Sequence, residues 1–411
     1  MNGHFDRLNI AIIGCGGRGR VNTSAVQSET IAAVCDVDER ELAISARQFP
    51  KARAYADWRR CIEQKDLDAV VCSTTDFTHA FVSTWALERG LHVYCENPLG
   101  VVVEEARAAR AAYLSARGKL ATQMGMRRAS NANLARVAAM IRGGAIGAPR
   151  EVHLWRAGTS RGNSYYPAAG PPPAALRWDL WLGPSPEHPY NPEYLAQRPC
   201  RCLSWSRHWD FGAGRIGGMG SSLMDIAWRA LELDAPLSCA CQGEAASPDS
   251  VPDWIAAEWK HPANAWRPAI AVHWHDGGRR PAPPSDVFDF ERMPAGALFR
   301  GDAGYVVCDF EQCCWAPNGK AANWRGPAAA MRGADGPGLH DEWIDACKTG
   351  APTSVNFDYA GRLAEHNLLA LVAFRAGRTI DYDAEASRCP NCPEAERYLR
   401  KPYREGWALK G

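Results

Sequence analysis

The chain of 411 residues has no long hydrophobic run, no excess of charge, and no internal repeat or low-complexity segment. No stretch reaches the roughly 18 consecutive apolar residues of a membrane-spanning helix. Its 47 Lys and Arg residues nearly balance 46 Asp and Glu residues, so a net charge of +1 gives no reason to expect a nucleic-acid or membrane partner. The first residues lead directly into an apolar strand without a signal peptide, which predicts a cytoplasmic protein.

A recognisable cysteine framework is also missing, although the chain contains 15 cysteines. An odd number scattered over a long chain argues against a set of disulfide bonds. Four close pairs could each supply half of a zinc site, but none has a second half at a typical distance. We therefore expect reduced cysteines and no bound metal. The pairs are Cys200/Cys202, Cys239/Cys241, Cys313/Cys314 and Cys389/Cys392.

The chain does contain a short apolar run at residues 10–13 that breaks into the pattern Gly14-x-Gly16-x-x-Gly19. Such a run is typical of a strand that is buried on both faces. In a dinucleotide-binding turn the first glycine makes the bend and the second lets the backbone approach a pyrophosphate. The third lets the following helix pack closely against the strand. The N–H groups at the start of that helix then bind the phosphates.

Two further apolar runs support a nucleotide site. Residues 31–35 end in Asp36, about 20 residues after the glycines, where an acid can bind the ribose hydroxyls of NAD. Because a carboxylate there would repel a 2′-phosphate, Asp36 predicts NAD in preference to NADP. Residues 69–72 end in a polar cluster at residues 73–76. The alternative is a sheet of the same type whose nucleotide site is empty or decayed.

Residues 8–122 alternate apolar strands with helical stretches, which is typical of a parallel sheet with crossover helices. Residues 151–155 alternate as in an antiparallel strand with one wet face. Residues 160–210, rich in Pro, Tyr and Trp, predict a long ordered loop across a surface. Helices are expected at 39–49, 58–65, 81–89, 104–116, 132–142, 219–233, 340–348 and 359–377, and further strands at 91–95, 120–124, 255–260, 270–275 and 305–310.

The expected fold is therefore α/β. It has an N-terminal doubly wound Rossmann domain (1–123) and a C-terminal α+β domain with a large, mostly antiparallel open sheet (124–384). A C-terminal tail (385–411) follows. The active cleft should lie where the carboxyl ends of the first sheet face the second domain.

Motifs spread over nearly the whole chain point to one family. They lie at residues 14–19, 34–38, 74–79, 92–99, 123–128, 178–184, 209–214 and 216–227, with Tyr403, Arg404 and Trp407 near the end. In combination they resemble the glucose–fructose oxidoreductase / inositol dehydrogenase / rhizopine-catabolism (Gfo/Idh/MocA) family. The resemblance implies an NAD(P)-binding Rossmann domain and hydride transfer on sugars, cyclitols or their glycosides. It also implies a homo-dimer or tetramer formed through the C-terminal sheet.

The motifs and the resemblance together predict the residues of the site. The cofactor-binding residues are Gly14, Gly16, Gly17, Arg18, Gly19, Asp36, Thr74, Thr75, Asp76, His79, Glu96 and Asn97. The substrate-binding residues are Arg128, Tyr165, Tyr166, Trp209, Asp225 and Arg229. Among them, His79 is expected to support the cofactor loop, and the two tyrosines could contact a sugar ring or only cover the core.

Two positions depart from the family pattern. The family carries Glu-Lys-Pro after the fourth strand, and its lysine stabilises a developing alkoxide and tunes proton transfer. This chain has Asn97, whose amide cannot hold a proton near neutral pH. A second segment of the family supplies an acid and, one helical turn later, a histidine. The matching positions here are Asp225 and Arg229, and arginine can hold an anion but cannot act as a base.

Three functions stay open at this point. An oxidoreductase with a rearranged site would use Asn97, Asp225, Arg229, His208 and Tyr166 as catalytic residues, and it is favoured because the glycine turn and Asp36 are intact. A pseudoenzyme would keep NAD and a metabolite, or support an active partner subunit, without redox chemistry. A lyase, hydrolase or isomerase would use other groups of the same cleft. Asp225 and Arg229 could equally pair only with each other, and His208 could be a loop residue.

Overall fold

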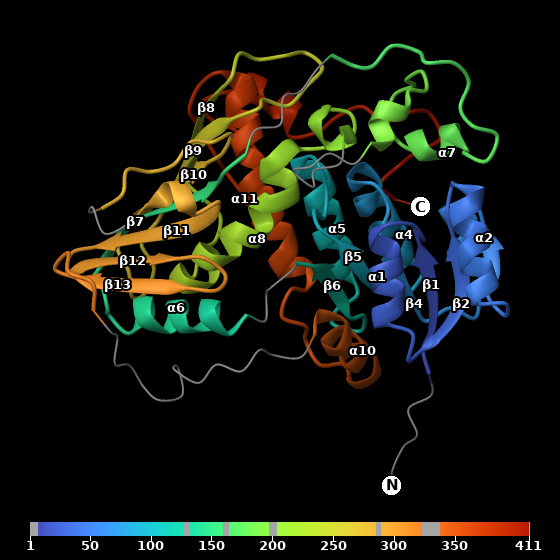
Figure 1. Cartoon of the computed structure of the whole chain (residues 1–411), viewed down its shortest axis with the longest axis horizontal. Coiled ribbons are helices and arrows are strands. Elements are labelled where there is room, and N and C mark those ends of the chain that lie inside the picture. The colour runs from blue at the N-terminus through green and yellow to red at the C-terminus, as the bar shows by residue number, and fades with distance from the viewer. Residues whose placement is uncertain are drawn as a thin grey trace, which may run out of the picture.

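The computed structural model describes residues 7–126, 131–158, 164–196, 204–284, 289–322 and 338–410. Two sheets stand side by side with helices α8 and α11 between them (Figure 1). The strands are β1 (Asn9–Ile13), β2 (Thr30–Cys35), β3 (Arg53–Tyr55), β4 (Ala69–Cys72), β5 (His92–Glu96), β6 (Thr122–Gly125), β7 (Pro149–Arg156), β8 (Ser238–Gly243), β9 (Ile255–His261), β10 (Ile270–His275), β11 (Ala295–Gly301), β12 (Gly304–Cys308), β13 (Cys313–Pro317) and β14 (Ile380–Asp381).

The helices alternate with the strands in the first half; in the rest, α8 and α11 pack against the second sheet and α10 packs against the first. They are α1 (Arg18–Ala25), α2 (Glu39–Gln48), α3 (Trp58–Cys61), α4 (His79–Glu88), α5 (Val103–Ser115), α6 (Ala132–Arg142), α7 (Trp178–Leu182), α8 (Gly214–Leu231), α10 (Leu339–Thr349) and α11 (Phe357–Ala376). Short 3₁₀ turns occupy 76–78, 192–195, 204–207, 290–292 and 393–398. Among the described residues, none of the helices has both the length and the apolar character of a membrane span.

The first sheet has the order β3-β2-β1-β4-β5-β6, and all its strands are parallel. Its strands are buried on both faces, because successive side chains point to opposite sides. Ile10 and Ile12 face a core that contains Trp343 of α10, whereas Ala11 and Ile13 face the core under α3, α4 and α5. The predicted Rossmann fold is thus confirmed.

The second sheet has the order β13-β12-β11-β7-β10-β9-β8-β14. All its pairs are antiparallel except β7 with β10, so the predicted mostly antiparallel sheet is confirmed. Its inner face, with Leu154, Trp259, Trp274 and Phe299, packs on the helix layer in the main core. The outer face carries a small apolar cluster around Trp155 and a polar region beside it.

Several predicted elements needed correction. The helix predicted at 58–65 ends at Cys61, and the strand at 151–155 pairs in parallel with β10 as well as antiparallel with β11. Helix α8 begins at Gly214, five residues before its predicted start. The predicted start is too late because the glycine-rich first turns of the helix have little intrinsic helical preference. The loop predicted at 160–210 contains the short helix α7. Strands β3, β8, β11, β13 and β14 were not predicted, because they are short, rich in small residues or at an edge.

The last residues of the chain return to the first sheet's helices (Figure 1). The ring of Tyr403 packs edge-on against Phe81 with centroids 5.0 Å apart. Trp407 contacts Trp58, and the Arg59 guanidinium lies 4.1 Å from the Trp407 ring centroid. The predicted tail therefore packs on the surface of α3 and α4.

Candidate functional site

The glycine turn between β1 and α1 leaves no room for side chains at two of its positions. A Cβ at Gly14 would lie 2.5 Å from the carbonyl oxygen of Ser73, and Gly14 has φ +85°. A Cβ at Gly19 would lie 1.8 Å from the carbonyl oxygen of Gly14. The first glycine therefore makes the bend and the third lets α1 approach the strand, as the pattern predicts.

Gly17, in contrast, faces open space. A Cβ there would meet nothing within 4 Å, and Gly17 has φ +49°. Within the described part of the chain, no side chain caps the start of α1. The first N–H groups of a helix that lacks such a cap are suited to binding phosphate oxygens. The turn therefore fits a dinucleotide pyrophosphate.

Asp36 follows β2 and holds the same turn from the neighbouring strand. Its Oδ2 accepts hydrogen bonds from the N–H groups of Cys15 (2.7 Å) and Gly16 (3.3 Å), and Oδ1 accepts from the Asp38 N–H (2.9 Å). Burial raises the pKa of Asp36 above its ordinary value, and the three N–H donors oppose that rise. The carboxylate thus lies beside the turn, where a dinucleotide ribose would bind.

Asn22 on α1 joins the ends of two strands of the first sheet, β4 and β5. Its Nδ2 donates to Ser73 Oγ (2.8 Å) and to Glu96 Oε1 (2.9 Å), while Arg18 Nε donates to the same Glu96 oxygen (2.8 Å). Nε2 of His340, on α10, lies 3.2 Å from Asn22 Oδ1, to which it donates in the tautomer that carries the proton on Nε2. The structure therefore brings the predicted residues Arg18 and Glu96 into direct contact, and Asn22, which sequence reasoning misses, binds the same carboxylate oxygen.

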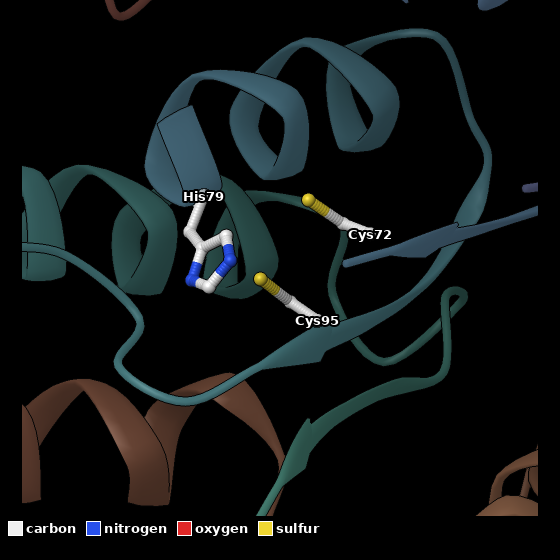
Figure 2. A group of neighbouring side chains, drawn as sticks. All are labelled: Cys72, His79 and Cys95. Carbon is white, nitrogen blue, oxygen red and sulfur yellow. The ribbon is translucent and has the colours of Figure 1, made fainter. Parts of the chain in front are cut away.

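His79 connects the loops that follow β4 and β5. Figure 2 shows its ring beside the sulfur atoms of Cys72 and Cys95. Nδ1 lies 2.7 Å from the carbonyl oxygen of Pro98, and Nε2 lies 3.2 Å from that of Thr74. Because carbonyl oxygens only accept, the ring satisfies both when both nitrogens are protonated. With both nitrogens occupied, this cluster has no imidazole lone pair for a metal.

The charge state of His79 fits that arrangement. Burial lowers the pKa of His79, but the neighbouring Cys72 and Asp76 outweigh it and raise the pKa overall. Burial raises the pKa of Cys72, and the hydrogen bond from Cys95 and the charge of His79 outweigh this and bring it to about 6. The raised pKa of His79 favours the doubly protonated ring that the two carbonyl oxygens require, which supports the positioning role expected for His79. Thr74 and Thr75 direct their hydroxyls to neighbouring residues of the same loop.

The cysteine pairs considered for zinc do not gather further ligands. In the described part of the chain, clusters of three potential metal ligands occur only at Cys72/His79/Cys95 and at Glu151/His153/His273. Neither cluster contains Cys239, Cys313 or Cys389. The pair Cys200/Cys202 lies outside the described residues.

Asn97 lies at the carboxyl end of β5 and contacts helix α8 of the second domain. Its Nδ2 donates to the carbonyl oxygen of Gly218 on α8 (2.6 Å), and its buried Oδ1 has no hydrogen-bond partner among the described residues. A Cβ at Gly218 would meet nothing within 4 Å. The next residue on the same helical face, one turn further, is Ser222. Gly218 itself therefore offers Asn97 a backbone carbonyl and no side chain.

Asp225 and Arg229 lie further along the same helix and form a closed network. Asp225 is seven residues beyond Gly218, which is about 10 Å along a helix axis. Arg229 Nε donates to both oxygens of Asp225 at 2.9 Å, and the Tyr359 hydroxyl donates to Oδ1. Burial raises the pKa of Asp225, against the effect of Arg229 and Tyr359. The structure therefore shows Asp225 and Arg229 paired with each other, which is one of the two alternatives that the sequence leaves open.

His208 and the two tyrosines belong to a buried aromatic cluster. His208 is fully buried, and its ring lies 5.2 Å from that of Tyr165 and 5.3 Å from that of Tyr166. Burial lowers the pKa of His208, so its imidazole is neutral near pH 7. The Tyr165 hydroxyl donates to Asp210 Oδ2 at 2.7 Å, and His188 Nε2 lies 2.8 Å from the same oxygen. The structure thus places His208 in a core, away from solvent.

Trp209 and Tyr165 line a cavity of about 370 Å³ that lies apart from Asn97. Among the described residues, neither Asn97 nor α8 lines it, whereas Arg375 and Lys401 do. The Arg375 guanidinium lies 4.7 Å from the centroid of the Trp209 ring. Two predicted substrate residues therefore line a cavity whose described lining does not include Asn97, Asp225 or Arg229. Arg128 lies outside the described residues.

Sequence reasoning misses two residues of this arrangement. Asn22 carries a detectable signal, because it is a polar residue on a helix face that packs against an apolar sheet. Gly218 carries none, because glycine has no functional group and its importance arises from the contact with Asn97.

Two family models match the chain. The first, an oxidoreductase family with an NAD-binding Rossmann fold, matches residues 8–123, and the second, the C-terminal α/β domain of the same family, matches residues 133–264. Inositol 2-dehydrogenase 2 of Saccharopolyspora erythraea is 30% identical over 173 residues, which are 41% of this chain and 49% of that relative. The chain thus spans about half the length of the relatives that it matches in sequence.

Solved structures share the fold at low sequence identity. The WlbA dehydrogenase of Chromobacterium violaceum, in complex with NADH and UDP-GlcNAcA, has a TM-score of 0.66 and 16% identity over 92% of this chain and 96% of its own. Levoglucosan dehydrogenase, in complex with NADH and levoglucosan, has a TM-score of 0.62 and 17% identity over 91% of this chain and 98% of its own. Both domain models and the shared fold lead to one assignment: the chain belongs to the Gfo/Idh/MocA family of oxidoreductases.

Proposed function

We propose that the protein binds a nicotinamide dinucleotide, NAD in preference to NADP, and acts as an oxidoreductase on a small polyhydroxylated molecule such as a sugar or cyclitol. The observation that carries this proposal is the glycine turn, in which Gly14 and Gly19 have no space for a Cβ and Gly17 faces open space. The bound cofactor would accept or donate a hydride at its nicotinamide ring. Relatives that are inositol 2-dehydrogenases support a polyhydroxylated substrate.

The preference for NAD rests on Asp36. Its carboxylate is anchored beside the turn by three N–H groups and would repel a 2′-phosphate. Arg40 could attract such a phosphate, but its guanidinium already donates to both oxygens of Asp38, at 3.0 and 2.7 Å. Titration of nicotinamide fluorescence with NADH and NADPH tests the preference. Equal affinities of the native protein for NADH and NADPH would contradict it. An Asp36→Asn variant that keeps the full preference would also contradict it, because the preference would then not arise from this carboxylate.

A second function, binding without turnover, is favoured by the surroundings of Asn97. In the family pattern, an acid and a histidine one turn apart act together with the lysine that Asn97 replaces. The α8 residue that contacts Asn97 is Gly218, and one turn further lies Ser222. We propose that these two residues, rather than Asp225 and Arg229, occupy the acid and histidine positions. A positioned acid or base typically contributes about 10²–10⁴-fold to a rate, and here every such group would be missing.

One set of variants separates the two functions. The native protein is assayed with NAD and NADH on a panel of sugars, cyclitols and their oxidised forms. The triple variant Asn97→Lys, Gly218→Asp, Ser222→His is assayed in parallel, and the open space at Gly218 accommodates its new side chain. Asn97→Lys with Arg229→His is the matched control for the other alignment. Turnover by the native protein excludes binding without turnover, and a gain only in the triple variant supports it. Failure to bind NADH excludes both.

Association through the outer face of the second sheet stays a prediction. Sedimentation of the full chain, with and without NADH, measures it.

A further inference from the structure

Five ionisable side chains share a small area on the outer face of the second sheet. They are Glu151 and His153 on β7, His273 and His275 on β10, and Glu258 on β9. These three strands are neighbours (Figure 1), and His273 is paired in register with His153 on one side and with Glu258 on the other. Residues two apart on a strand point to the same face. The backbone register therefore directs all five side chains to one side of the sheet.

Three of these side chains converge. One donor atom each from Glu151, His153 and His273 lies within 4.8 Å of the other two, and all three residues are half-buried. The His153 and His273 rings are stacked with centroids 4.4 Å apart. Oε1 of Glu151 lies 3.3 Å from Nε2 of His153. Two ligands of a tetrahedral zinc ion, each about 2.0–2.1 Å from the metal, are separated by about 3.3–3.4 Å.

Each histidine of this trio has a second partner on its other side. His153 Nδ1 lies 3.2 Å from His275 Nε2, and His273 Nδ1 lies 3.6 Å from Glu258 Oε2. When His153 donates from Nδ1 to His275, its Nε2 lone pair points toward the Glu151 carboxylate. Two acceptors then face each other, and a cation between them removes the repulsion. Metal-bound histidines usually carry such a partner on the nitrogen that does not bind the metal.

The charges around the cluster are close to balance. Arg300 lies 3.3 Å from Glu151 Oε1, and Lys260 lies 4.0 Å from Glu258 Oε1, so each carboxylate already has one cation nearby. The imidazoles are therefore the donors that decide which ion fits.

We propose that Glu151, His153 and His273 bind one divalent transition-metal ion of the zinc class, with His275 and Glu258 orienting the two imidazoles. Two histidines and one carboxylate are a known ligand set for such ions, and imidazole donors exclude magnesium and calcium as the preferred occupants. The site lies on the face of the sheet opposite to α8 and is independent of the dinucleotide turn.

Calorimetric titration with zinc sulfate tests the site on the full chain, after removal of any affinity tag and of bound metals. We expect one zinc ion per chain near neutral pH. His273→Gln should weaken zinc binding by more than about 100-fold, and Glu258→Gln, which removes only an orienting partner, by about 10–100-fold. Cobalt should give the visible absorption of a tetrahedral site in the native chain and lose it in His273→Gln.

The control is His92→Gln, which removes one imidazole from the first sheet and should leave zinc affinity unchanged. If His273→Gln lowers the melting temperature, Glu151→Gln replaces it as the variant that tests zinc binding, because glutamine is nearly isosteric with glutamate. The proposal fails if zinc does not bind in a saturable one-to-one ratio. It also fails if Glu151→Gln and His273→Gln bind zinc as tightly as the native chain, because the metal would then sit elsewhere.

Discussion

Gly19→Ala is the sharpest test of the dinucleotide turn. The added Cβ would lie 1.8 Å from the carbonyl oxygen of Gly14, whereas Cβ atoms essentially never approach a heavy atom within 3.0 Å. One of the two segments must therefore move by more than 1 Å. Gly14 cannot yield easily, because its N–H donates to the carbonyl oxygen of Cys35 at 2.8 Å and its own Cα already faces Ser73. The first turn of α1 must move away from β1.

That movement carries the phosphate-binding N–H groups away from the position of the pyrophosphate. We expect Gly19→Ala to weaken NADH binding by at least about 10-fold, which is about 1.4 kcal/mol. Overpacking of this kind typically lowers the free energy of unfolding by about 1–3 kcal/mol. Nicotinamide fluorescence gives the affinity, and urea unfolding monitored by circular dichroism gives the stability.

The matched control is Gly118→Ala, at a turn before β6. Gly118 also has a positive φ, +73°, but a Cβ there meets nothing within 4 Å. This variant should lose about 1 kcal/mol of stability and keep NADH affinity. If Gly19→Ala binds NADH like the native protein, the argument from the close approach of α1 is refuted, and with it the assignment of the turn as the pyrophosphate site.

Three further predictions concern charge and packing. Arg229→Met leaves Asp225 buried without its cation and should cost about 3–5 kcal/mol in urea unfolding. Arg362→Met breaks an i, i+4 pair with the partly exposed Asp358, which keeps Arg110, and should cost about 0.5 kcal/mol or less; equal costs would contradict the burial argument. Burial raises the pKa of Asp76 from 3.8 to about 6, so the folded chain binds its proton more tightly than the unfolded chain. The stability that this proton contributes is complete below pH 3.8 and lost as the pH rises through about 6. The native chain should therefore lose up to about 3 kcal/mol over that range relative to Asp76→Asn, and parallel pH profiles would refute it. Trp407→Ala removes the contact of the tail with α3 and should lower the free energy of unfolding by about 1–3 kcal/mol, seen as a lower melting temperature; an unchanged one would mean that the tail adds no stability.

Much of the first domain could be predicted because its signals are local. The bend at Gly14 and the close approach at Gly19 require glycine for steric reasons that act within a few residues. Strands buried on both faces appear as short apolar runs, and the spacing from the glycines to Asp36 reflects one strand–helix–strand unit. These features therefore predict the nucleotide turn and the family from the sequence alone.

The second domain contains strands and contacts that no local sequence pattern predicts. Strands β8, β11 and β13 contain small residues, glycines and an edge proline, and they are strands because neighbours pair with them. The prediction that Asp225 and Arg229 are site residues depended on their match to a family segment, in which an acid and a histidine lie one helical turn apart. Only the docking of α8 on the first domain put Gly218 opposite Asn97.

By itself, the sequence determined the glycine turn, the parallel first sheet and the loss of a lysine at Asn97, because each depends on residues close together in the chain. The tertiary structure alone brought Tyr359 to the Asp225–Arg229 pair, which the spacing along the helix had left as an alternative. It alone also brought Glu151, His153 and His273 within reach of one ion. The physical reason is the same in both cases: contacts between segments more than 100 residues apart follow from sheet register and helix docking, which no local pattern specifies.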